Sequence, residues 1–338
     1  MKSYHITAAG TAAAALTLRE HAVPEPGPGE VLVRMRANAV SFRDLLILAD
    51  DYPLPVRPDV VAGCEGAGEV VALGTGAGTL APGDRVALTV FPDWVDGPFG
   101  LDRAAQLGSW LDGTLTEYRV VAERALVRIP DHLSYEEAAA LPLTMLTAWN
   151  ALTGGRPLLP GETVLTLGTG AVSLAAVQLA VQAGARVIAT TSGAAKAVRL
   201  KELGADEVID RTAEPDWHEV VRELTGGRGV EQVVHVAGAL DQSLRATGLG
   251  GEIAYVGYRV ADTPTGPAVD ARLLFAAGAQ VRPVAVGSRA QFTALNRAVA
   301  VHRTRPVIDR VFPFLEAPAA FRHYREGRPF GRVVISHG

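Results

Sequence analysis

Two glycines in the middle of the chain have the spacing of a phosphate-binding turn. Gly168 and Gly170 follow the apolar run 164–167 and precede a stretch whose apolar residues recur with a helical period. Gly168 allows a tight turn, and Gly170 allows the backbone to approach a pyrophosphate closely. The amides that open the helix, at Ala171 and Val172, face the phosphates, and the helix dipole favours their negative charge.

The motif reads GxGxxS, because Ser173 stands where a third glycine is usual. Serine is small enough for close packing between the helix and the strand, so we expect the geometry to survive. A second apolar run, 186–190, follows the helix. The succession of strand, glycine turn, helix and strand predicts a βαβ unit that binds a dinucleotide.

The end of the second strand indicates which dinucleotide is bound. NAD-binding proteins usually carry an acidic residue there, which accepts hydrogen bonds from the ribose hydroxyls. Here the strand ends in Thr190, Thr191 and Ser192 without an acid, and Lys196 follows. A cation and hydroxyl groups suit a 2′-phosphate, with Arg211 as a further cation. We therefore predict that NADP is preferred, with NAD as the alternative.

The ends of the later strands should line the same crevice. Their residues are small or apolar, which permits close approach of a flat nicotinamide ring; they are Val236, Ala237, Val256, Gly257 and Val286. His235 lies within an apolar strand. We interpret it as a hydrogen-bonded core histidine, with proton donation as the alternative.

The order of elements predicts two domains. Short strands at 31–40, 63–73, 85–90 and 116–121 favour a small antiparallel barrel or sandwich. After Pro130, Ser134 and Glu137 form a capping-box pattern, and an Ala-rich helix follows that should stop near Pro142. From Thr163 strands and helices alternate, which predicts an α/β fold with a doubly wound parallel sheet.

Composition excludes several classes of function. The 338 residues carry a net charge of −4, which gives no support for a nucleic-acid partner. The single cysteine, Cys64, cannot form an intramolecular disulfide or a cysteine-rich zinc lobe. No apolar run is long enough to span a bilayer, and the start is a poor match to a signal peptide. We expect a cytoplasmic protein with no membrane partner.

At this point the motifs resemble those of a known family, the medium-chain dehydrogenase/reductase superfamily, over nearly the whole chain. Among its members the chain is most similar to zinc-independent, quinone-oxidoreductase-like alcohol dehydrogenases. The matching segments are PEPGPGEVLVRMRANAVSFRD, GCEGAGEVVALG, PGDRVAL, GTLTEYRVV, LPLTMLTAWNAL, VLTLGTGAVSLAAVQLA, LGADEVID, LTGGRGVEQVV, GGEIAYVG and FGRVVI.

The resemblance implies a GroES-like β-barrel catalytic domain and a Rossmann domain. The first would comprise residues 1–128 and 289–338, because the C-terminal tail returns to the barrel, and the second would comprise 129–288. It also implies a homodimer and an NAD(P)H cofactor.

The resemblance also locates the positions where zinc-dependent members bind their catalytic metal. These fall on Ser41, on Cys64, where GHE has become GCE, and near Leu143. Only Cys64 is a good zinc ligand, and a catalytic zinc needs three protein ligands. We therefore predict a site without metal.

Without zinc, hydrogen-bond donors must stabilise the charge that develops on the acceptor oxygen. We predict Ser41 and Tyr52 as the catalytic residues, since Tyr52 matches a pocket tyrosine of relatives. Packing of Tyr52 within its loop, and helix capping by Ser41, are the alternatives. Arg43, Trp94 and Trp110 are candidates for the substrate pocket. Arg43 could instead pair with Asp44, and the two tryptophans could pin their own loop.

Two further cofactor residues follow from the resemblance alone. Thr147 corresponds to a threonine near the nicotinamide in relatives, although a helical threonine often bonds its own backbone. Arg332 sits where relatives place a basic residue near the cofactor.

These observations predict an NADP(H)-preferring, zinc-independent oxidoreductase. It would transfer hydride to a carbonyl or an activated C=C bond of a small apolar substrate such as an enone, a quinone or an aldehyde. Two alternatives stay open: a non-catalytic NADP(H)-binding protein of the same fold, and an S-adenosylmethionine methyltransferase, which also uses a glycine-rich first turn.

Overall fold

The computed structural model describes residues 1–7, 15–238, 240–257, 269–327 and 329–338. The chain divides into two compact units: unit 1 comprises 1–146 and 286–338, and unit 2 comprises 147–285. The sequence prediction had set these boundaries at 128/129 and 288/289. Residues 129–146 join unit 1 because helix α2 (Tyr135–Ala138) packs against β3 (Glu30–Val40), β4 (Gly66–Leu73) and β15 (Arg332–Ser336).

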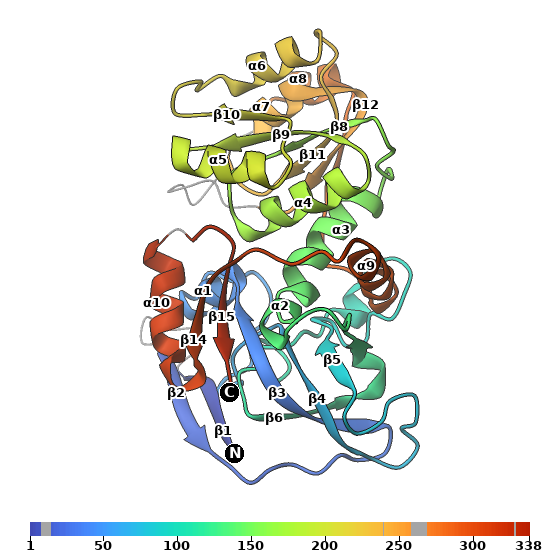
Figure 1. Ribbon diagram of the computed structural model, residues 1–338, viewed down its shortest axis with the longest axis vertical. Coiled ribbons are helices and arrows are strands. Elements are labelled where there is room, and N and C mark those ends of the chain that lie inside the picture. The colour runs from blue at the N-terminus through green and yellow to red at the C-terminus, as the bar shows by residue number, and fades with distance from the viewer. Residues whose placement is uncertain (8–14, 239, 258–268, 328) are drawn as a thin grey trace. The chain divides into compact units, whose positions relative to one another are not determined.

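Unit 2 is built on a six-stranded parallel sheet with the order β10-β9-β8-β11-β12-β13 (Figure 1). The strands are β8 (Thr163–Thr166), β9 (Arg186–Thr191), β10 (Glu207–Asp210), β11 (Val230–His235), β12 (Thr247–Tyr255) and β13 (Gln280–Pro283). The chain winds outward from β8 in one direction and then from β11 in the other. In such sheets ligands bind beyond the carboxyl ends of the two central strands, where the winding direction changes.

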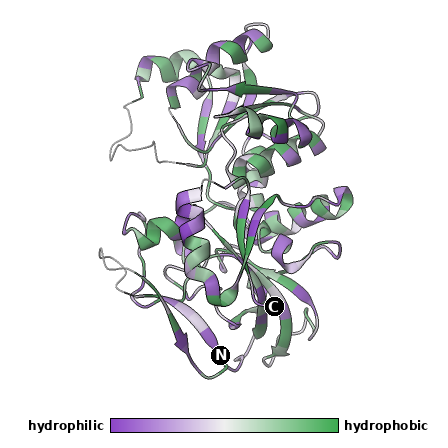
Figure 2. Ribbon diagram, turned by 60° about the vertical axis from the view of Figure 1, so that its left-hand side comes forward, coloured by the Kyte–Doolittle hydropathy of each residue, from purple (hydrophilic) through white to green (hydrophobic). Residues whose placement is uncertain are grey.

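Helices cover this sheet. Helix α4 (Ala171–Gln182) packs on β8 and β9, and α5 (Ala194–Glu202) packs on β9 and β10. Three helices, α6 (Trp217–Leu224), α7 (Leu240–Ala246) and α8 (Ala271–Ala277), contact one another in series. Leu165, Ile188, Val233 and Ile253 form a buried core with Trp217 and Leu244. The ribbon coloured by hydropathy shows the apolar strands of this sheet between helices of mixed polarity (Figure 2).

Unit 1 contains a seven-stranded mixed sheet with the order β14-β15-β3-β4-β5-β7, and β6 also pairs with β3. Its remaining strands are β5 (Arg85–Leu88), β6 (Tyr118–Ala122), β7 (Leu126–Arg128) and β14 (Ile308–Pro313). A separate hairpin is formed by β1 (Lys2–Thr7) and β2 (Ala15–Glu20). Strand β15 lies antiparallel to β3, so the expected return of the C-terminal tail to the first unit is confirmed.

Three further helices belong wholly to unit 1: α1 (Phe42–Leu48), α9 (Arg289–His302) and α10 (Ala317–Gly327). The predicted capping box of α2 is confirmed, since the Ser134 hydroxyl accepts from the Glu137 amide and the Glu137 carboxylate accepts from the Ser134 amide.

The predicted stop of the Ala-rich helix near Pro142 is confirmed, since α2 ends at Ala138. The chain continues through a π-helical turn, Leu141–Met145, into α3 (Leu146–Thr153). Pro142 occupies the start of that turn, where its missing N–H deprives no carbonyl of a helical partner. No helix among the described residues is long and apolar enough to cross a membrane.

Candidate functional site

The turn between β8 and α4 leaves open space above its two glycines. Gly168 has a φ of +77°, which favours glycine, and its amide donates to Thr190 Oγ1 at 3.0 Å. A Cβ added at Gly168 or at Gly170 would meet no atom within 4 Å. Gly170 is the N-cap of α4 and supplies no side-chain oxygen to the helix amides. The start of α4 is therefore available to an anion.

Ser173 performs the packing role that was expected of it. The side chain is fully buried, and its hydroxyl donates to the Leu167 carbonyl at 2.7 Å. Serine in place of the third glycine therefore adds a hydrogen bond between α4 and the residue that follows β8, and the helix and the strand still pack closely.

The end of β9 bears hydroxyl groups and no carboxylate. Thr191 is fully buried, and its Oγ1 has no hydrogen-bond partner among the described residues. Ser192 is exposed, and Lys196 is half-buried in the first turn of α5. The Arg211 amide donates to the Thr191 carbonyl at 3.0 Å, which places Arg211 beside the same strand end.

The later strand ends approach one another closely. A Cβ at Gly257 would lie 1.8 Å from the Val236 carbonyl oxygen, so only glycine fits there. Ala237 is exposed, and Val256 is half-buried, as is Val286 at the start of the returning part of unit 1. Thr147, the first residue of unit 2, is 4% exposed.

His235 is a core histidine, as we interpreted it. Its Nδ1 lies 2.9 Å from the Ser243 hydroxyl, and its ring stacks on Tyr255. Burial lowers the pKa of His235 to about 4, so the ring is neutral at pH 7.

In unit 1, Ser41 is the N-cap of α1. Its hydroxyl accepts from the Asp44 amide and donates to Asp44 Oδ2 at 2.6 Å, and its own amide donates to the same oxygen. The side chain is 1% exposed. The capping alternative therefore describes Ser41, and its hydroxyl is not directed at a substrate.

Tyr52 and Arg43 form a second polar group. The Tyr52 hydroxyl donates to Gln106 Oε1 at 2.9 Å, and the Arg43 guanidinium lies 5.1 Å from the centre of the Tyr52 ring. Arg43 does not form an ion pair with Asp44, because its Nη2 donates to the Leu107 carbonyl and to Ser109 Oγ, both at 2.9 Å. Gln106 was not predicted, and nothing in the loop sequence distinguishes it.

The positions that correspond to zinc ligands hold a different set of groups. Cys64 is fully buried, and burial raises the pKa of its thiol, which disfavours the thiolate that binds metal. Ser41 Oγ lies 3.4 Å from the sulfur, and the backbone amide of Leu143 donates to Glu65. Within the described residues no three His, Cys, Asp or Glu side chains could hold a metal ion together. These donors do not fit a catalytic zinc.

Arg332 lies in the same core. It forms an ion pair with Glu65, and both side chains are nearly inaccessible to solvent. Burial lowers the pKa of Arg332 to about 10, so it stays charged at neutral pH. The structure thus gives Arg332 a role inside unit 1 that the sequence did not suggest, and its predicted contact with a cofactor stays a prediction.

The two tryptophans differ. Trp94 is 4% exposed, packs with Phe91 and Phe99, and donates through Nε1 to the Gly97 carbonyl at 2.8 Å. This is the alternative in which the loop is pinned by its own aromatic residues. Trp110 is 53% exposed and remains a candidate for contact with a substrate.

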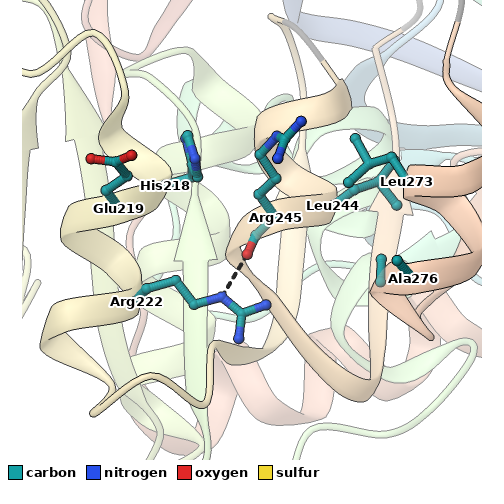
Figure 3. A pocket seen from close by; sticks show the side chains of 8 residues that line it. His218, Glu219, Arg222, Leu244, Arg245, Leu273 and Ala276 are labelled. Atoms are coloured by element: carbon teal, nitrogen blue, oxygen red, sulfur yellow. Dashed lines mark hydrogen bonds between the residues drawn. The ribbon is translucent and has the colours of Figure 1, made fainter.

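A pocket of about 430 Å³ lies elsewhere on unit 2, between α6, α7 and α8 (Figure 3). Its polar lining is largely engaged, since Arg222 donates to the backbone carbonyls of Arg245, Gly227 and Thr247. None of its lining residues is among the predicted cofactor residues. We assign it no part in the site.

Comparisons with known proteins agree with this architecture. Residues 27–131 match the alcohol dehydrogenase GroES-like domain, and residues 171–300 match the zinc-binding dehydrogenase family. A zinc-type alcohol dehydrogenase-like protein of Schizosaccharomyces pombe is 35% identical over 324 residues, covering 94% of this chain and 93% of the relative. A quinone oxidoreductase of Pseudomonas aeruginosa is 37% identical over 63% of this chain and 59% of its own length.

The solved structure of an NAD-dependent alcohol dehydrogenase superposes with a TM-score of 0.89. It is 35% identical, with full coverage of both chains.

Substitution of Gly170 should separate nucleotide binding from folding. Its φ of −73° and ψ of 163° suit any residue, and a Cβ added there meets no atom within 4 Å. We expect Gly170→Val to leave the Tm within about 2 °C of the native value and to weaken NADPH binding at least about tenfold. Fluorescence titration and thermal unfolding measure the two effects. Gly78→Val, at an equally open position in unit 1, is the control, and unchanged NADPH affinity in Gly170→Val would place the nucleotide elsewhere.

Proposed function

Because this chain belongs to the medium-chain dehydrogenase/reductase superfamily, we propose that it is a zinc-independent oxidoreductase that prefers NADP(H). Its substrate would be a small apolar molecule with a carbonyl or an activated C=C bond, such as an enone, a quinone or an aldehyde. The observation that carries the proposal is the start of α4, which has no side-chain cap. The space beside Gly168 and Gly170, within 4 Å of an added Cβ, holds no protein atom.

The residues of unit 2 fit a nicotinamide dinucleotide. The amides of Ala171 and Val172 would hold the pyrophosphate, and the unpartnered hydroxyl of Thr191 at the end of β9 would serve the ribose side. Ser192 and Lys196 would contact a 2′-phosphate. When bound, the nicotinamide supplies the hydride.

The residues of unit 1 would act on the oxygen of the substrate. As hydride reaches the acceptor carbon, negative charge develops on that oxygen, and a hydrogen-bond donor stabilises it. Tyr52 carries the hydroxyl best suited to this task, because it is half-buried and its proton is shared only with the neutral amide oxygen of Gln106. The phenol would donate its proton to the reduced substrate and recover one from solvent.

The descriptions of one matching family and of one similar structure differ from this proposal in the metal and in the cofactor. One matching family is described as zinc-binding, and one similar structure is described as NAD-dependent. For this chain the ligand chemistry around Cys64 supports metal-free catalysis, and the hydroxyl-bearing end of β9 supports NADP.

Removal of the Tyr52 hydroxyl tests the proposed activity. Tyr52→Phe keeps the ring and loses the donor, so we expect kcat for NADPH-dependent reduction to fall about 100-fold with little change in the KM for NADPH. Tyr118→Phe is the matched control, since that hydroxyl has no described hydrogen bond. A panel of enones, quinones and aldehydes is needed to find a substrate. Binding of NADPH without turnover of any of them would favour the non-catalytic alternative.

The end of β9 should control cofactor choice. Ser192→Asp places a carboxylate beside the ribose, where it repels a 2′-phosphate and accepts from a 2′-hydroxyl. We expect the ratio of kcat/KM for NADPH to that for NADH to fall at least about tenfold. Lys196→Ala should lower the same ratio more weakly, about three- to fivefold, because one phosphate partner is lost. A ratio that both variants leave unchanged would contradict the NADP preference.

We also propose that unit 2 pairs with a second copy of the chain. Strand β13 is the edge of the sheet, Phe275 on α8 is 90% exposed, and Leu249 beside Gly278 is 84% exposed. An open strand edge next to exposed apolar side chains favours association.

A charge in this patch should break the dimer. We expect Phe275→Asp to shift the sedimentation profile from dimer to monomer at micromolar concentration, because the aspartate would have to be buried without a partner. Leu101→Asp is the control, since Leu101 is equally exposed but lies in unit 1. A monomeric native protein, or a dimer that Phe275→Asp leaves intact, would refute this interface.

A further inference from the structure

Arg43 is a half-buried cation with no carboxylate at ion-pairing distance among the described residues. Its Nη2 is satisfied by the Leu107 carbonyl and Ser109 Oγ, whereas its buried Nε and Nη1 form no hydrogen bond of regular geometry and lie near Tyr52 and Cys64. The nearest acid, Asp44, has its Oδ2 committed to the amide and hydroxyl of Ser41. A partly desolvated cation left in this way is costly to the folded protein.

The groups around Arg43 are neutral except for the carboxylate of Asp44, which is not at ion-pairing distance. Burial raises the pKa of the Cys64 thiol, so the sulfur carries no charge at pH 7. Burial lowers the pKa of Arg43, but Cys64, Tyr52 and Asp44 together raise it above the ordinary arginine value. The guanidinium therefore keeps its charge, and that charge faces the ring of Tyr52.

The same side chain also organises the partner of Tyr52. Leu107 and Ser109, which accept from Arg43, follow directly after Gln106, which accepts from the Tyr52 hydroxyl. Gln106 is 2% exposed. One guanidinium thus holds the face of the phenol ring and the loop that fixes the direction of its O–H bond.

We propose that Arg43 is the positioning residue for proton transfer by Tyr52, and that it stabilises the phenolate formed when Tyr52 protonates the reduced substrate. The inference rests on the proposed function. In the resting protein the cation lies beside a neutral phenol. In the transfer the O–H bond of Tyr52 breaks, a new bond to hydrogen forms on the substrate, and the electron pair left on the phenol oxygen gains the attraction of the positive charge of Arg43.

A double-mutant cycle between Arg43 and Tyr52 tests this proposal. With the native Tyr52, we expect Arg43→Gln to lower kcat about 30-fold and Arg43→Lys to lower it less, because the lysine keeps the charge but not the planar fork. In a Tyr52→Phe background, the same Arg43→Gln change should lower kcat no more than about threefold, since no phenolate forms. The KM for NADPH should stay unchanged throughout.

Two controls distinguish this role from a merely structural one. Ser109→Ala removes one of the two loop contacts of Arg43 but leaves the guanidinium over the Tyr52 ring, so kcat should fall clearly less than in Arg43→Gln. Arg124→Gln removes an exposed arginine that pairs with Asp93, and it should leave kcat and Tm unchanged.

The outcomes separate the two proposals. An equal loss of kcat from Arg43→Gln in both backgrounds, or a loss as large in Ser109→Ala, would overturn the role of Arg43 while leaving Tyr52 as donor. If Arg43→Gln is fully active while Tyr52→Phe is impaired, the role of Arg43 is likewise overturned and Tyr52 remains the donor. Full activity of Tyr52→Phe would overturn the proposed proton donor itself, and the inference with it.

Discussion

The start of α4 imposes the constraint on which unit 2 depends. A helix leaves its first amides without intrahelical partners, and Gly170 provides no side chain to satisfy them. The sheet order places this end of the helix beyond the carboxyl end of β8, next to β11, at the change of winding direction. Ser173 and Thr190 bind the backbone around the turn, so the opening is held by hydrogen bonds on both sides.

Unit 1 is distinguished by charged side chains that lie wholly or partly away from water. Glu65 and Arg332 form an ion pair, and both side chains are buried. Arg43 has no such partner: its Nη2 donates to the Leu107 carbonyl and the Ser109 hydroxyl, and its guanidinium faces the Tyr52 ring, with Asp44 near enough to raise its pKa. A cation that is already paired with a carboxylate contributes mainly to the architecture, whereas a cation without a carboxylate at ion-pairing distance can respond to negative charge that appears only during a reaction.

Most of the fold followed from local patterns, and the failures have physical causes. The βαβ unit at 163–191 was predictable because its apolar periods and its glycine turn agree with one another. The capping box at Ser134 was predictable because its chemistry lies within four residues. The stop of α2 before Pro142 was predicted, but the π-helical turn Leu141–Met145 that follows was not. Helix α8 was not predicted. The hairpin β1–β2 was not predicted either, because its alternation of apolar and polar residues is too short to identify two strands.

The site was less predictable than the fold, because its contacts join residues that are distant in the sequence. Gln106 meets Tyr52 across 54 positions, and Arg332 meets Glu65 from the opposite end of the chain. Sequence reasoning identified Arg43 and Tyr52 but could not say which groups face them. The position of Ser41 shows the converse: a hydroxyl at a position that resembles a catalytic one is committed to a helix cap by a carboxylate three residues away. The residue type at a given position determines which functional group is present. The hydrogen bonds that neighbouring residues make to that group determine whether it is free to contact a substrate.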